Sequence, residues 1–166
     1  MPEIRAMQPD EVEQVFALWN AGCIAAVGTP LREEDAQRVR IVLRKYPDQT
    51  QARCFVAVEN GAIIGFVTCA VLQHPVLFGL NGEIEELMVT PRYRQRQIKA
   101  ALVRHAVAYM KQHQVSRIHT TVGMDEPREK AFWRRLGWLN DMTIFSIYHS
   151  VPGDPDAQRT WDEYEA

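Results

Sequence analysis

The strongest local constraint in the sequence is an Asn-Gly pair between two runs of strand-forming residues. Asn60-Gly61 follows the run 54–59 and precedes the run 62–71, and both runs are rich in valine and phenylalanine. A two-residue hairpin turn of type I′ needs positive φ at both central residues, which Asn-Gly adopts most readily. The chain is therefore predicted to contain a β-hairpin, around which its other elements are arranged.

Before the hairpin, the hydrophobic spacing predicts one strand and two helices. The strand covers 3–7, and the first helix begins at Pro9, since proline is tolerated in a first helical turn. The segment 22–28 is interpreted as a loop, with Thr29-Pro30 starting the second helix. The predicted buried face of that helix consists of Val39, Val42, Leu43 and Tyr46.

After the hairpin, strands and helices alternate. The predicted elements are a strand over 83–89, a helix over 97–113, a strand over 117–122, a helix over 126–136 stopped by Gly137, and a strand over 143–148. The element order is βααβββαβαβ. This order predicts an α/β (α+β) fold, a mixed central β-sheet flanked by helices. Residues 1–150 would form one domain and residues 151–166 an acidic C-terminal tail.

Composition excludes several classes of protein. A net charge of −2 with 46% hydrophobic residues argues against intrinsic disorder, and a pI of about 6.2 argues against a general nucleic-acid binder. The sequence has neither an 18-residue apolar run nor an N-terminal signal pattern, so no membrane association and a cytoplasmic location are expected. Three cysteines without CxxC spacing and five scattered histidines predict no disulfide framework and no metal site.

The distribution of charge is more informative than its sum. Seven basic residues and no acid lie between positions 92 and 124. Glu83, Glu85 and Glu86 come just before this stretch. A basic loop that enters a helix at about 94–99 predicts a phosphate site, because free N–H groups and the helix dipole both favour an anion there. An anion site is thus expected beside a cation site.

Two motifs around this junction resemble a known family. The pattern Val89-x-Pro91-x-x-Arg94-x-x-x-Ile98-x-x-x-Leu102 resembles the acetyl-CoA-binding segment of the GCN5-related N-acetyltransferases, the GNAT family. The stretch 131–138 is similar to that family's helix that ends in Tyr and then Leu-Gly-Phe, and 4–10 is similar to its usual start. The element order matches over 3–149.

The resemblance implies a fold, an activity and a set of contacts. It implies a GNAT-like domain that transfers an acetyl group from acetyl-CoA, as co-substrate, to a primary amine of a small molecule or peptide. Backbone groups of 87–89 would contact the pantetheine arm and polarise the thioester. The implied cofactor-binding residues are Leu87, Met88, Val89, Arg94, Gln95, Arg96, Gln97, Ile98, Lys99 and Trp133.

The sequence departs from the family pattern at two places. The family's pyrophosphate loop usually carries glycine, which permits positive φ, where this chain has Gln95, Gln97 and Lys99. The usual general acid is a tyrosine, and its position holds Trp133, whose indole N–H is too weak an acid to give up its proton. The other proton donors considered are Tyr93, Tyr148 and His149. A coenzyme A thiolate also leaves readily without an acid.

The three glutamates are the candidate catalytic residues, because the amine must lose a proton before it attacks the thioester. Strand alternation places Glu83 and Glu85 on one face and Glu86 on the other, unless a bulge intervenes. The sequence does not choose among the three. Their charge favours a cationic acceptor such as a polyamine, an aminoglycoside-like compound, an amino acid or a peptide.

The acceptor cleft is expected to be lined by the loops 22–29 and 72–82. Trp161 and Tyr164 in the tail would cover this cleft or contact a partner chain, and a homodimer is left open. The alternative function is a catalytically inactive GNAT-fold acyl-CoA sensor or protein-interaction module. The missing loop glycines and Trp133 favour that alternative, whereas the glutamates and the basic loop favour the enzyme.

Overall fold

The computed structural model describes residues 2–73, 79–93 and 97–140. The chain forms two compact units, Met1–Glu126 and Pro127–Ala166. The elements of the first unit are β1 (Glu3–Ala6), η1 (Pro9–Glu11), α1 (Val12–Val27), α2 (Glu33–Lys45), η2 (Tyr46–Asp48), β2 (Ala52–Glu59), β3 (Ala62–Gln73), β4 (Leu80–Val89), η3 (Pro91–Tyr93), α3 (Ile98–Gln112) and β5 (Arg117–Thr120).

One mixed sheet organises the first unit, as the sequence predicts. Its strand order is β1-β2-β3-β4-β5. All neighbouring strands are antiparallel except β4 and β5, which run parallel and are joined through α3. The predicted hairpin joins β2 to β3, and Asn60 and Gly61 have φ values of 52° and 77°. Positive φ at both residues confirms the turn prediction.

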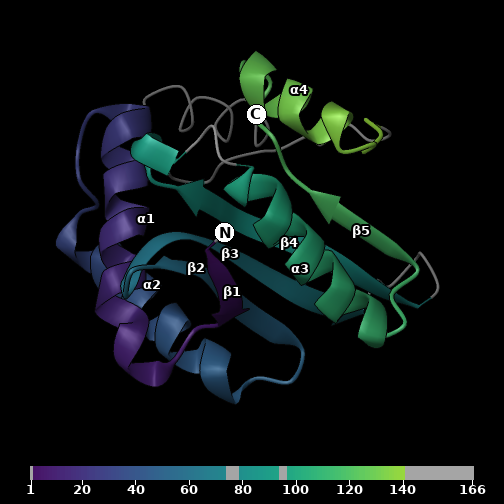
Figure 1. The fold of residues 1–166 in the computed structure, drawn as a ribbon, viewed down its shortest axis with the longest axis horizontal. Coiled ribbons are helices and arrows are strands. Elements are labelled where there is room, and N and C mark those ends of the chain that lie inside the picture. Colours follow the sequence, from purple (N-terminus) through teal and green to yellow (C-terminus); the bar gives the residue numbers. More distant parts are fainter. Residues whose placement is uncertain (1, 74–78, 94–96, 141–166) are drawn as a thin grey trace, which may run out of the picture. The chain divides into compact units, whose positions relative to one another are not determined.

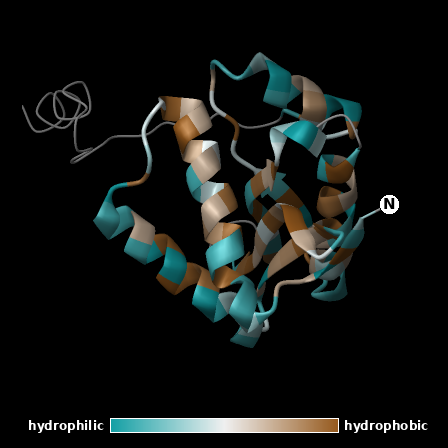
Figure 2. Ribbon diagram, turned by 60° about the vertical axis from the view of Figure 1, so that its left-hand side comes forward, coloured by the Kyte–Doolittle hydropathy of each residue, from teal (hydrophilic) through white to brown (hydrophobic). Residues whose placement is uncertain are grey.

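Helices cover both faces of this sheet. Figure 1 shows α1 and α2 together at one side of the sheet and α3 at the other. Phe16 and Leu43, from α1 and α2, belong to one buried cluster with Phe66 of β3. On the opposite face, the ring of Phe55 lies 4.9 Å from that of His105 in α3. Figure 2 shows the corresponding pattern, with largely brown strands and helices that alternate between brown and teal.

The first helix is longer than predicted. The segment 22–28 is not a loop, because α1 continues to Val27 and ends at Gly28, whose φ is 79° and whose N–H donates to Ile24 O at 2.9 Å. A single internal glycine costs a helix only about 1 kcal/mol. Gly22 also makes room for a neighbour, since a Cβ at this position would lie 2.2 Å from Met88 Sδ. The sequence pattern suggested that Gly22 breaks the helix. Its role is instead to allow α1 to pack closely against Met88 of β4.

The second helix starts later than predicted. Thr29-Pro30 is not its start, since α2 begins at Glu33 with Arg32 as N-cap. Three acidic residues in its first turn favour this start, because they face the positive end of the helix dipole. Val42 was wrongly assigned to the buried face and is 44% exposed, whereas Leu43 is buried. The buried residues of the helix, Ala36 and Leu43, are seven positions apart and therefore lie two turns apart on one stripe, which Val42 does not share.

The second unit contains α4 (Pro127–Arg135). Gly137 follows this helix with a φ of 84°, and the N–H of Trp138 donates to Trp133 O at 3.1 Å. This pattern is the glycine-terminated helix end that the sequence predicts. The predicted strand over 143–148 lies outside the described residues. Among the described helices of both units, none is long and apolar enough to span a membrane.

Candidate active site

A β-bulge in β4 brings the candidate glutamates to one face of the sheet. Thr68 of β3 pairs with Glu86, whereas the next β3 residue, Cys69, pairs with Ile84, so Glu85 is an extra residue in β4. Ala70 pairs with Glu83. Thr68 and Ala70 are two residues apart in β3 and share a face, so Glu83 and Glu86 also share it. A bulge is the exception to strict alternation that the sequence prediction allowed for, and it places Glu86 on the face of Glu83.

Glu85 is held from the same face by a tyrosine of η2. The hydroxyl of Tyr46 donates to Glu85 Oε2 at 2.8 Å. Burial, followed by the charge of Glu85, raises the pKa of Tyr46 above its usual value, so the phenol remains protonated and acts as a donor. The carboxylate of Glu85 itself lies at an exposed position. A fixed, accessible carboxylate is thus presented at the bulge.

Glu86 has a different environment from that of Glu85. Its backbone N–H donates to Thr68 Oγ1 at 3.1 Å, and Thr68 is fully buried. Burial raises the pKa of the Glu86 carboxyl, and the charge of Glu85 raises it further. A carboxylate with a raised pKa is a better proton acceptor near neutral pH than an ordinary glutamate. The two neighbouring glutamates are therefore chemically distinct.

Glu83 lies at the other end of the bulge, beside β5. It pairs with His119 of that strand, and the distance from Glu83 Oε2 to His119 Nε2 is 4.0 Å. This separation is too long for a hydrogen bond. Both side chains are about one-third exposed, at 29% for Glu83 and 33% for His119. Glu83 therefore contributes charge to the same face, and His119 does not hold its carboxylate by a hydrogen bond.

Beyond the bulge, β4 continues without β5. The two strands pair only over Asn81–Ile84 and Arg117–Thr120, and among the described residues no strand pairs with the same edge of β4 over 85–89. Leu87, Met88 and Val89 form this part of β4 and pair with β3 on their other side. A free strand edge offers backbone N–H and C=O groups to an extended ligand. The three residues predicted to contact pantetheine lie on this edge.

The position of this edge depends on a glycine in β3. Gly65 pairs with Val89, and a Cβ at Gly65 would lie 2.8 Å from Met88 O and 2.9 Å from Val89 Cγ2. Both distances are shorter than ordinary contacts with a real side chain. Glycine at position 65 thus allows β3 to approach β4 closely, where the carbonyl of Met88 is located.

The N-terminus of α3 follows β4 after η3. Gln97 is the N-cap and has a φ of 56°, in the left-handed region that glycine adopts without strain. The position therefore has the backbone conformation for which the family usually uses glycine. Ile98 is buried and anchors the first turn, while Lys99 is half-buried. Arg94, Gln95 and Arg96 lie outside the described residues.

Trp133, the remaining predicted cofactor contact, belongs to the second unit. Its ring centroid lies 5.1 Å from that of Phe132 and 4.7 Å from that of Trp138, and the residue is buried. Within this unit Trp133 is part of an aromatic cluster at the end of α4. The structure thus brings Glu83, Glu85 and Glu86 together with the free edge of β4, whereas Trp133 belongs to the second unit.

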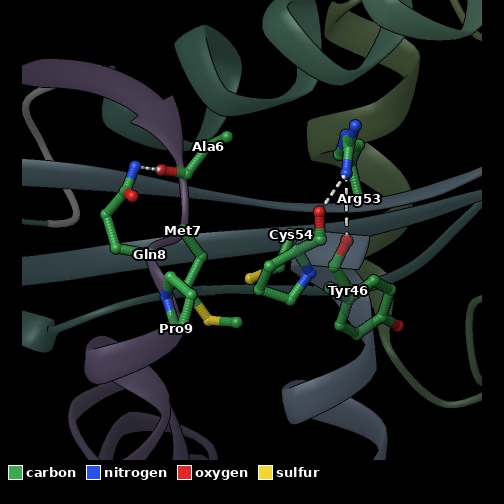
Figure 3. Close-up of a pocket in the computed structure, with 8 residues that line it drawn as sticks. Ala6, Met7, Gln8, Pro9, Tyr46, Arg53 and Cys54 are labelled. Carbon is green, nitrogen blue, oxygen red and sulfur yellow. Dashed lines mark hydrogen bonds between the residues drawn. The ribbon is translucent and has the colours of Figure 1, made fainter. Parts of the chain in front are cut away.

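Two small cavities adjoin Tyr46 on different sides. One, of about 310 Å³, includes Glu85 in its wall. Its lining residues are Val42, Tyr46, Gln49, Gln51, Ala52, Ala70, Val71, Leu72 and Glu85. The other, of about 240 Å³, lies between β1, η1, η2 and β2, and none of its described lining residues is a carboxylate. In Figure 3, Arg53 beside this second cavity points to backbone carbonyls, and it donates to Tyr46 O at 3.1 Å and to Pro47 O at 3.0 Å.

Sequence reasoning missed two residues of this site, Tyr46 and Thr68. Tyr46 was assigned only to a buried helix face, and the structure places it at the start of η2, where it is 5% exposed and reaches Glu85. Thr68 is a fully buried polar residue in an otherwise apolar stretch of β3. That lone hydroxyl was the available signal, since a buried hydroxyl needs a partner. Within the described residues, no group of three or more His, Cys, Asp or Glu could hold a metal ion.

Comparisons with known proteins point to one family. A sequence model of the acetyltransferase (GNAT) family matches residues 13–138. No curated protein gives a significant sequence match. A transcriptional regulator from Bacillus halodurans has a similar structure, with a TM-score of 0.77 and 15% identity over 89% of this chain and 99% of that chain.

Two acetyltransferases are also similar in structure. An aminoglycoside 6′-N-acetyltransferase from Acinetobacter haemolyticus has a TM-score of 0.74 and 15% identity, over 90% of this chain and 99% of that chain. AAC(6′)-Iy, in complex with a CoA-containing bisubstrate analogue, has a TM-score of 0.74 and 15% identity, over 88% of this chain and 97% of that chain. Identities this low establish the shared fold alone.

Proposed function

Because the chain belongs to the GNAT family of acetyltransferases, we propose that it transfers the acetyl group of acetyl-CoA to a primary amine of a small molecule or peptide. The observation that carries this proposal is the bulge at Glu85. It gathers three carboxylates on one face of β4, directly before the free edge formed by Leu87, Met88 and Val89. A proton acceptor and a backbone contact for a thioester are thereby adjacent in one strand.

The residues of the chain fit acetyl-CoA as a co-substrate. Backbone groups of Leu87, Met88 and Val89 would hold the pantetheine arm, and the N-terminus of α3 would receive the phosphates. The left-handed Gln97 supports this role, since its backbone has the conformation expected of a phosphate loop. The remaining proposed contacts are Arg94, Gln95, Arg96, Ile98, Lys99 and Trp133.

Proton transfer is proposed to be divided between the two neighbouring glutamates. Glu85, which is accessible and held by Tyr46, binds the ammonium form of the acceptor. Glu86, whose pKa is raised, accepts its proton and leaves a neutral amine. The amine nitrogen then forms a bond to the thioester carbon, the C–S bond breaks, and the electron pair leaves with the sulfur as a thiolate. The nitrogen of the adduct releases its second proton to solvent, and the thiolate takes up one proton from solvent. The products are an N-acetylated amine and coenzyme A.

The remaining groups act around this reaction. Glu83 adds negative charge to the face where the cation arrives. A backbone N–H on the free edge of β4 would stabilise the developing oxyanion, in the way that oriented donors do in acyl transfer. Trp133 is not assigned as an acid, because an indole N–H does not give up its proton. The leaving thiolate needs no acid to depart.

Replacement of all three glutamates by glutamine tests the proposal. We expect the triple variant to bind acetyl-CoA normally in isothermal titration calorimetry and to release no thiol when an amine library is supplied. Glu34→Gln is the matched control, since this exposed glutamate at the start of α2 lies far from β4 in sequence and outside the bulge. Unchanged turnover in the triple variant would refute the catalytic role of the glutamates. If the parent protein gave no detectable heat with millimolar acetyl-CoA, the proposed acetyltransferase activity would be refuted.

The alternative is a catalytically inactive acyl-CoA sensor or protein-interaction module with this fold. Glutamine at the loop position 97 and tryptophan at 133 favour it. Binding of acetyl-CoA without turnover across the amine library would support the sensor. A cytoplasmic location, a homodimer and a lack of nucleic-acid binding stay predictions.

A further inference from the structure

We infer that the 310 Å³ cavity beside Glu85 is the acceptor pocket and that it takes a small monoamine with a short aliphatic chain. The inference rests on the proposed function, and it specifies the class of substrate that the glutamate face receives. Its basis is the chemistry of the nine described residues in the cavity wall, among which Glu85 is the single carboxylate and none is a lysine, arginine or histidine.

Charge complementarity selects a cation for this cavity. Among the described lining residues the Glu85 carboxylate has no positive partner, and it accepts a hydrogen bond from the Tyr46 hydroxyl at 2.8 Å. A carboxylate has lone pairs for about four hydrogen bonds, so this group retains capacity for an ammonium ion. One carboxylate balances one ammonium group, which favours a monoamine over a polycation inside the pocket.

Tyr46 acts here as a positioning residue. It is 5% exposed, and Arg53 anchors the turn that carries it through bonds to the carbonyls of Tyr46 and Pro47. The charge of Arg53 is thereby directed to the backbone of η2 (Figure 3). The phenol and the turn together fix the orientation of the Glu85 carboxylate at the pocket.

The rest of the wall favours an aliphatic chain. Val42 and Leu72 are 44% and 46% exposed and lie at the cavity together with Ala70 and Val71. Aliphatic groups of a ligand that covered these side chains would be removed from water together with them. The volume is at the low end of the range for small-molecule sites, so the ligand is a small one.

The geometry places the ammonium end toward the reaction. Glu85 is two residues before Leu87 in β4, a distance of about 7 Å along an extended strand. An amine bound at Glu85 therefore lies close to the free strand edge that begins at Leu87. Its aliphatic chain extends away from this edge, toward Val42 and Leu72. Glu86 is the adjacent residue that receives the proton.

Binding of n-hexylamine to the full chain without acetyl-CoA tests the pocket. We expect saturable binding by calorimetry, with 1-hexanol at least about tenfold weaker, equivalent to 1.4 kcal/mol, because it lacks the ammonium group. Glu85→Gln should weaken hexylamine about tenfold and leave hexanol unchanged. Tyr46→Phe should weaken hexylamine severalfold. Tyr109→Phe is its control, since the Tyr109 hydroxyl donates to Thr50 O at 2.6 Å and lies outside the cavity.

Leu72→Lys provides a second test of the pocket in case Tyr46→Phe, at a buried position, fails to fold. Leu72 is exposed at the rim, so the substitution preserves the core, and the added cation should weaken hexylamine by repulsion. The assignment of this cavity as the acceptor pocket would be refuted if the parent, Glu85→Gln and Leu72→Lys proteins bound hexylamine with equal affinity. It would also be refuted if the parent protein showed no binding at 10 mM hexylamine. Acetyl-CoA binding and thiol release are measured separately, so failure of the pocket is distinguishable from failure of the proposed function.

Discussion

The hydroxyl of Tyr46 donates a 2.8 Å hydrogen bond to the carboxylate of Glu85, 39 residues away in the sequence. This bond links a turn after α2 to the bulge of β4. Thr68 makes a second such contact, because it accepts the backbone N–H of Glu86 at 3.1 Å. Each of the two neighbouring glutamates is therefore hydrogen-bonded to a buried hydroxyl, Glu85 through its carboxylate and Glu86 through its backbone.

Replacement of Glu86 by glutamine should abolish turnover and stabilise the protein. Burial raises the pKa of Glu86, so between its unfolded and folded pKa values the folded state retains a proton that the unfolded chain has lost. The stability of the parent protein therefore falls as pH rises through this window. Glu86→Gln should raise the Tm by about 1 to 3 °C at pH 7 and leave it unchanged below pH 4. Thermal melts across pH measure this, and a gain that is equal at all pH values would contradict it.

The same titration should appear in the kinetics. A general base must be deprotonated, so kcat/KM should fall on the acid side at a pKa above the ordinary value for glutamate. Glu34→Gln should retain the profile of the parent, because this residue lies outside the site. In Glu85→Gln the acid limb should persist and move to lower pH, because the charge of Glu85 contributes to the raised pKa of Glu86. An acid limb that disappears in Glu85→Gln would instead identify Glu85 as the titrating group.

Thr68→Val should weaken both the fold and the site. The substitution removes the acceptor of the Glu86 N–H, and a buried unpaired donor costs about 1–3 kcal/mol. Thr68→Ser retains the hydroxyl and should preserve thiol release. Chemical denaturation gives the stability, and a loss in the serine variant without one in the valine variant would show that the methyl group, not the hydrogen bond, matters.

Gln97→Gly should tighten acetyl-CoA binding. Glycine adopts the φ of 56° without the strain of a side chain, and it lets a phosphate approach the backbone. We expect the Kd to fall by about threefold or more, equivalent to roughly 0.7 kcal/mol.

Gln114→Gly is the matched control for this change. Gln114 also has a positive φ, of 57°, and it lies beyond the other end of α3. The control should gain similar stability with no change in the Kd for acetyl-CoA. Equal tightening in both variants would indicate a general effect on stability and would contradict a phosphate site at Gln97.

Gly65→Ala should separate β3 from β4 and weaken acetyl-CoA binding. The new Cβ would meet Met88 O, a backbone atom that yields only if the strand moves, at a cost of about 1–3 kcal/mol. Gly82→Ala offers a comparison, because its nearest obstacle is the flexible Met110 side chain at 2.5 Å. We expect a smaller loss of stability at Gly82 by chemical denaturation and no effect there on the Kd for acetyl-CoA.

The local chemistry of the sequence determined most of the elements. Asn60-Gly61 specified the hairpin, the apolar spacing specified α3, and Gly137 specified the end of α4, because turn type and helix termination depend on neighbouring residues alone. The motifs around Pro91 also indicated the family that the match over residues 13–138 establishes. The predictions failed at Gly22, since its role is to admit Met88 from a distant strand.

Tertiary structure alone decided how the glutamates are arranged. A bulge is a property of the pairing between two strands, so the sequence of β4 by itself leaves Glu86 on the wrong face. The partners of the glutamates, Tyr46 and Thr68, come from η2 and β3. Their burial, and with it the raised pKa of Glu86, exists only when α2 and the sheet pack together. The sequence thus determined which carboxylates are available, and the fold decided which one is held by a phenol and which one is poised to accept a proton.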